Sequence, residues 1–112
     1  MVKTIRIDGK DYDMKSSAYT QFAYKNLTGR SFLSDIESLS GIKGEDFSKV
    51  DGLIEILLDI SYVMIDEANP NRFKNEQEFI KSIDHLFEEP KWIEEVVALA
   101  IMPLSAGNNK TN

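Results

Sequence analysis

The sequence predicts a mainly α-helical domain of the α+β class, in which an N-terminal β-hairpin is followed by about five helices in a compact bundle. Near the N-terminus, apolar and polar residues alternate on both sides of an Asp-Gly pair, while apolar residues recur at helical spacing along the rest of the chain. The 112 residues include no cysteine, so the core forms without disulfides. We predict a single domain over 1–104 and a flexible, polar C-terminal tail over 105–112.

The hairpin is predicted over residues 3–15, with Asp8-Gly9 as its turn. Four apolar residues alternate with polar neighbours on the two strands, namely Ile5, Ile7, Tyr12 and Met14. Two strands alone are marginally stable in water. We therefore expect the hairpin to lie against the helices, although an open strand edge could also pair with another chain.

Two amphipathic helices are predicted between Ser16 and Gly41, separated by Thr28-Gly29-Arg30. Ser16 or Ser17 can cap the first helix and Ser31 the second, and Gly29 suits a left-handed helix end. The two apolar stripes consist of Tyr19, Phe22, Ala23 and Leu27, and then of Phe32, Leu33, Ile36 and Leu39. Arg30 is either a partner contact or an arginine that is solvated or paired with a carboxylate.

A polar connector is predicted over 42–51, and the most apolar part of the chain follows it. Ser48 or Asp51, both in this connector, can cap the next helix. From Leu53 to Ile65, ten of thirteen residues are apolar. A helix that is apolar nearly all round lies in a core or at an interface. Asn69-Pro70-Asn71 is expected to end it.

Two further helices are predicted in the C-terminal third. Asn75 and Glu78 form a capping-box pattern at the start of the first. Its apolar stripe consists of Phe79, Ile80, Ile83, Leu86 and Phe87. The last helix contains ten apolar residues among the thirteen from Trp92 to Leu104, with Pro90 suited to its first turn and Pro103 to its end.

Patterns that would carry chemistry are weak, and we predict no enzyme, cofactor or metal site. The only histidine, His85, is expected at the surface of a helix beside Asp84, and adjacent helical residues cannot form a catalytic pair. Ser82 stands where a di-iron Glu-x-x-His motif requires glutamate. The paired acidic residues, such as Glu55 with Asp59, are typical of a solvated face.

The charge distribution argues against nucleic acid as a partner. The net charge is −6, with a balance of +3 over residues 1–30 and −9 over residues 31–112, and no Lys/Arg cluster is present. No apolar run approaches the ~18 residues of a membrane span, and the N-terminus lacks the features of a signal peptide. We therefore expect a soluble protein that contacts neither nucleic acid nor membranes.

Five helices, two of them nearly all apolar, offer more apolar surface than a small domain needs for its own core. The sequence therefore predicts a helical protein–protein interaction module. Aromatic and arginine side chains contribute most at such interfaces. Our candidate partner-binding residues are Tyr19, Phe22, Arg30, Phe87, Trp92 and Ile101.

The order of these segments resembles that of the tail assembly chaperones of long-tailed (siphovirus-type) phages and prophages of Gram-positive bacteria. The resemblance covers roughly residues 3–104 and rests on IDGKDYDMK, AYTQFAYKNLTGR, SFLSDIESL and LIEILLDISYVMI. Relatives are expected to have Asp after the Gly-Arg pair, where this chain has Ser31.

The resemblance implies a non-enzymatic chaperone that binds the tape measure protein, keeps it soluble and helps to recruit tail-tube (major tail) subunits. It also implies action in the host bacterial cytoplasm, absence from the mature virion and, in many relatives, a longer frameshifted form. Self-association, through the hairpin edge or apolar helices, is a further expectation. The alternative is a small acidic adaptor or regulatory protein of a phage or prophage.

Overall fold

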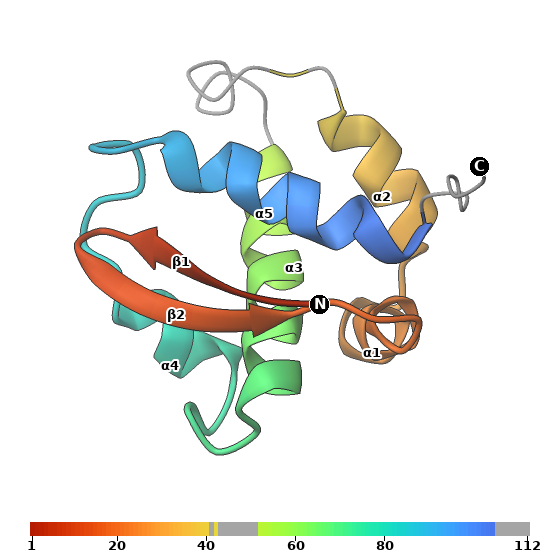
Figure 1. Ribbon diagram of the computed structural model, residues 1–112, viewed down its shortest axis with the longest axis horizontal. Coiled ribbons are helices and arrows are strands. Elements are labelled where there is room, and N and C mark those ends of the chain that lie inside the picture. The colour runs from red at the N-terminus through yellow and green to blue at the C-terminus, as the bar shows by residue number, and fades with distance from the viewer. Residues whose placement is uncertain (41, 43–51, 105–112) are drawn as a thin grey trace.

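The computed structural model describes residues 1–40, 42 and 52–104 and confirms the predicted α+β class. Most of the predicted connector and the whole predicted tail lie outside the described residues, as do the proposed helix caps Ser48 and Asp51. The elements are β1 (Val2–Ile7), β2 (Lys10–Lys15), α1 (Thr20–Thr28), α2 (Phe32–Leu39), α3 (Leu53–Ala68), α4 (Glu76–Lys81), α5 (Lys91–Ile101) and the 3-10 turn η2 (Met102–Leu104). Figure 1 shows the hairpin and the other helices arranged around α3.

The hairpin forms as predicted, with β1 antiparallel to β2 and Ile5 opposite Tyr12. Asp8 and Gly9 both have positive φ, as a tight turn of this kind requires. All four alternating apolar side chains are fully buried. The outer face carries polar cross-strand pairs instead, including the Arg6–Asp11 ion pair. One face of the hairpin therefore belongs to the core.

Helix α3 is the centre of the core, which confirms one of the two expected places for this apolar segment. Eight of its sixteen residues are buried. It packs against β2, α1, α2, α4 and α5. It ends at Ala68, next to Asn69, as expected, and begins after Gly52, which has a left-handed backbone conformation.

The break between the first two helices is also as predicted. Gly29 closes α1 in the left-handed conformation, and the Ser31 side chain accepts a hydrogen bond from the Ser34 N–H at the start of α2. The start of α1 differs from the prediction, because its N-cap residue is Tyr19, which makes no side-chain capping bond. The Ser17 hydroxyl oxygen instead accepts a hydrogen bond from the Tyr19 N–H, just before the helix. The chain thus turns sharply at Gly29 and brings α2 against α1.

The helix predicted from Asn75 to Phe87 is shorter in the structure, where α4 ends at Lys81, so the prediction is wrong beyond that residue. The start is correct, since Asn75 accepts a hydrogen bond from the Glu78 N–H. After α4 the chain meets the hairpin turn, where Lys10 donates to the Ser82 carbonyl and Asp8 accepts from the N–H groups of residues 84 and 85. These bonds replace the helical ones, so residues 82–90 form a turn-rich segment.

The last helix begins after Pro90 and ends at Ile101, directly before the 3-10 turn that contains Pro103. Its inner face is apolar, and Lys3 of β1 forms an ion pair with Glu95 at 3.4 Å. Helix α5 thus covers the β1 side of the core. Within the described ranges, none of the helices has both the length and the apolar character needed to cross a bilayer.

Candidate functional site

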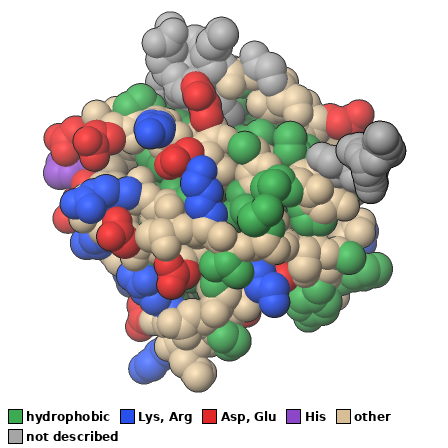
Figure 2. Space-filling model, in the orientation of Figure 1, with side chains coloured by type: hydrophobic (Ala, Val, Ile, Leu, Met, Phe, Trp, Pro, Cys, Tyr) green, Lys and Arg blue, Asp and Glu red, His purple; other side chains and the backbone are tan. Residues whose placement is uncertain are grey.

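Among the residues that the structure describes, most of the exposed large apolar side chains lie in two regions. The first lies on and beside α1 and α2 and consists of Tyr19, Phe22, Leu27 and Leu33. The second lies where β1 begins and α5 ends and consists of Met1, Val2, Ile101 and Met102. In Figure 2, hydrophobic side chains gather over α5 and α1, whereas charged side chains dominate the opposite edge of the same face.

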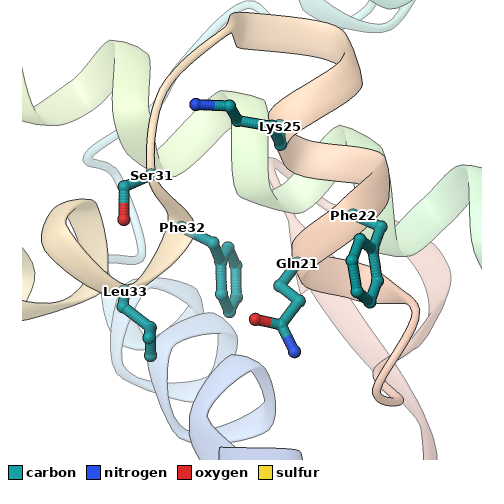
Figure 3. A pocket seen from close by; sticks show the side chains of 6 residues that line it. All are labelled: Gln21, Phe22, Lys25, Ser31, Phe32 and Leu33. Carbon is teal, nitrogen blue, oxygen red and sulfur yellow. The ribbon is translucent and has the colours of Figure 1, made fainter.

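The first region contains a hollow of about 240 Å³, which we call the α1–α2 groove. It is lined by Gln21, Phe22, Lys25, Ser31, Phe32 and Leu33. Figure 3 shows Phe22 of α1 and Leu33 of α2 on opposite sides, with Phe32 and Gln21 between them. The volume is below the roughly 300–1,000 Å³ usual for small-molecule sites. Phe22, Phe32 and Leu33 form the apolar part of its lining, and Gln21, Lys25 and Ser31 form the polar part.

Polar contacts explain why α1 exposes Phe22. The Thr20 hydroxyl donates to Glu67 of α3 at 2.8 Å, and the Ser17 hydroxyl donates to the same carboxylate. Tyr24 is fully buried, packs edge-on against Phe32 and donates to Asp35. These contacts direct Thr20 and Tyr24 inward. Phe22, two residues from Tyr24, consequently faces away from the core and is 62% exposed.

Arg30 links three helices from the turn after α1. Its guanidinium donates to Asp35 of α2 at 2.9 Å and to Asp59 of α3 at 2.8 Å. It also donates to the Tyr24 hydroxyl and lies over the Tyr24 ring. The hydrogen bonds to both carboxylates raise the pKa of Arg30 above its usual value. The structure therefore shows Arg30 paired with carboxylates, while its role as a partner contact stays a prediction.

A third carboxyl group, that of Glu76, completes this cluster at the start of α4. Burial, followed by proximity to Asp59, raises the pKa of Glu76 to about 8. Glu76 Oε2 is buried and has no hydrogen-bond partner as a carboxylate. A protonated Glu76 can instead donate to Asp59, which leaves Asp59 as the charged partner of Arg30. Sequence reasoning paired Asp59 with Glu55 and missed Glu76, because helical spacing gives no information about contacts between α3 and α4.

The six candidate partner-binding residues have different environments. Tyr19 and Phe22 are prominently exposed, and Phe87 and Ile101 are partly exposed, at 38% and 37%. Trp92 must be corrected, because it is only 1% exposed and its indole N–H donates to the Leu86 carbonyl. Trp92 is therefore a core residue. Two residues that the prediction omitted, Leu33 and Lys25, line the α1–α2 groove with Phe22.

The second region contains several hollows, two of which are lined by residues of α5. One, of about 390 Å³, is lined by Met1, Val2, Lys3, Glu95, Ala98, Leu99 and Met102. The other, of about 260 Å³, lies between α5 and the end of α2 and includes Ile101. Both hollows have mainly aliphatic linings. Neither lining contains an aromatic residue, in contrast to the α1–α2 groove.

Comparisons with known proteins found no family model, no curated protein and no solved structure that matches this chain.

Proposed function

We propose that this protein is a non-enzymatic tail assembly chaperone that binds an apolar helical stretch of a phage tape measure protein in the α1–α2 groove. The sequence resemblance suggests the client, and the groove supplies the observation on which the proposal rests. Phe22 and Leu33 are exposed on adjoining helices around one hollow. An amphipathic helix can place its apolar side chains in such a groove.

The charge around the groove favours a client helix that carries acidic residues beside its apolar stripe. Lys25 lines the groove, and no ion pair involving it occurs among the described residues. The net charge of −6 keeps the loaded chaperone soluble. Several copies along one extended client would gain avidity from individually weak contacts. Recruitment of tail-tube subunits would then occur on a client that stays unaggregated.

Co-expression with the tape measure protein of the same phage or prophage tests the proposal. We expect the two proteins to elute together in size-exclusion chromatography and the tape measure protein to precipitate when expressed alone. The double variant Phe22→Ser/Leu33→Ser should abolish co-elution while circular dichroism stays unchanged. Ile80→Ser is the matched control, because Ile80 is exposed outside the groove. Separate elution of the two wild-type proteins would contradict the proposal.

The same preparation separates the chaperone from the adaptor or regulatory alternative. An adaptor would bind another phage or host protein and leave the tape measure protein insoluble. We further propose action in the host cytoplasm and absence from the finished particle. Mass spectrometry of purified virions should detect the tail-tube protein but not this chain. Light scattering at increasing concentration measures the proposed self-association.

A further inference from the structure

The hairpin turn and the 82–90 segment bring together three side chains with metal-binding atoms. Asp8, His85 and Glu88 each offer one ligand atom, and these three atoms all lie within 4.8 Å of one another. Asp8 precedes the other two by more than seventy residues, so only the tertiary fold creates this cluster. In Figure 2 the histidine, in purple, lies at the edge of the molecule beside acidic side chains.

The distance between His85 and Asp8 matches that between two ligands of one metal ion. His85 Nδ1 lies 3.5 Å from Asp8 Oδ1, beyond the usual range of an N–H···O bond. Two ligands that are each about 2.0–2.2 Å from a tetrahedral zinc ion are separated by a comparable distance. Glu88 is exposed and adjustable, so it can complete a three-ligand site that water fills out.

The Asp8 carboxylate is held in place by the protein backbone. Its Oδ2 atom accepts hydrogen bonds from the N–H groups of Asp84, at 2.9 Å, and His85, at 3.3 Å. The bond from Asp84 is the main reason that the pKa of Asp8 is lowered, so the group stays ionised. This leaves Oδ1 directed toward the imidazole. Outer hydrogen bonds of this kind orient metal-binding carboxylates in known sites.

We propose that Asp8, His85 and Glu88 bind one divalent first-row transition ion, for which Zn²⁺ is the appropriate probe. A site with imidazole and two carboxylates favours such ions over Ca²⁺ and Mg²⁺, which prefer oxygen ligands alone. The bound ion fastens the hairpin turn to the segment that carries Phe87. This inference is independent of the proposed chaperone function and departs from the expectation, drawn from the sequence, that the chain has no metal site.

The composition makes the experiment unusually clean. The chain has one histidine and no cysteine, so every imidazole effect reports on His85 once any purification tag has been removed. We expect Zn²⁺ titration to shift the single histidine ring signal in NMR spectra, with saturation at one equivalent. Isothermal calorimetry should give the same stoichiometry. Equal concentrations of Mg²⁺ should leave the ring signal unmoved.

Variants then assign the ligands. His85→Asn and Glu88→Gln should each weaken Zn²⁺ binding at least tenfold, whereas the matched control Glu89→Gln should bind within twofold of wild type. The substituted side chains are exposed, so the folded structure should persist, which thermal unfolding without metal checks. Zinc binding by His85→Asn within twofold of wild type, or a histidine signal that does not move, would overturn the proposal.

Discussion

Helices α3 and α1 use their apolar residues in opposite ways. Helix α3 buries Leu57, Ile60 and Met64 completely at the centre of the molecule. Helix α1 buries Thr20 and Tyr24 and leaves Phe22 exposed. The difference lies in their neighbours: α3 is surrounded by packed elements, while α1 is fixed from one side by hydrogen bonds to α3 and α2.

The comparison shows that an amphipathic stripe does not by itself decide which face of a helix is buried. In α1 the polar groups of Thr20 and Tyr24 face inward, where their hydroxyls donate hydrogen bonds to Glu67 and Asp35. Phe22 is left outside with Leu33 beside the groove. Buried apolar residues therefore lie mainly in α3, and the surface that we propose for binding lies on α1 and α2.

The largest effect that tests this division is expected in α3. Leu57→Ala should lower the free energy of unfolding by about 2–5 kcal/mol, because it leaves a cavity at a fully buried position. Chemical denaturation measures the change. The same substitution at Leu33, which is 52% exposed, should stay within about 0.5 kcal/mol of wild type. Equal losses at the two positions would contradict the division.

A smaller effect is expected at the link between the two regions. Arg30→Ala should destabilise the fold by about 1–3 kcal/mol, because it leaves Asp35 and Asp59 without their cation. Arg30→Lys should recover only part of this, since one ammonium cannot reproduce the forked contacts. Arg6→Ala removes an exposed ion pair and is the control, with a change of at most about 1 kcal/mol.

A pH-dependent effect is expected at Glu76, where α4 meets this link. The pKa of Glu76 is about 8 in the folded chain and 4.5 as its ordinary value. Between pH 4.5 and 8 the folded state retains a proton on Glu76 that the unfolded state releases. The stabilising contribution of Glu76 is therefore complete below pH 4.5 and is lost as the pH rises through 8. Glu76→Gln should unfold at a higher temperature than wild type at about pH 9, where the carboxyl would be charged.

This pH effect is tested by measuring the unfolding temperature of wild type and variants as a function of pH. The amide introduced by Glu76→Gln keeps a donor toward Asp59 without titrating, so this variant should show a flatter profile between about pH 5 and 8. Glu55→Gln removes an exposed carboxylate from α3 and should retain the wild-type profile. Identical profiles for Glu76→Gln and wild type would show that this carboxyl does not carry the pH dependence.

The smallest effect on stability is expected where the effect on binding is largest. Phe22→Ser should change the free energy of unfolding by no more than about 0.5 kcal/mol, because Phe22 is mainly solvent-exposed. The same variant should lose affinity for the client. A large loss of stability would place Phe22 in the core and contradict the exposed groove.

Local signals in the sequence were sufficient for most element boundaries. Asp8-Gly9 located the hairpin turn, and Gly29 and Ser31 located the end of one helix and the start of the next. These residues act through their own backbone or their nearest neighbours. Contacts between distant segments could not be predicted in this way. The helix expected through Phe87 stops at Lys81 because the hairpin turn binds its backbone.

The sequence by itself determined the hairpin, the order of the helices and the central place of the apolar segment after Gly52, because periodicity and turn chemistry are local properties. Only the tertiary structure decided which aromatic residues are exposed, since this depends on partners far along the chain. In the folded chain Trp92 is buried and donates to the Leu86 carbonyl, Phe22 is exposed across the groove from Leu33, and Asp8 lies close to His85. Candidate binding residues are chosen by such long-range contacts, which no local pattern records.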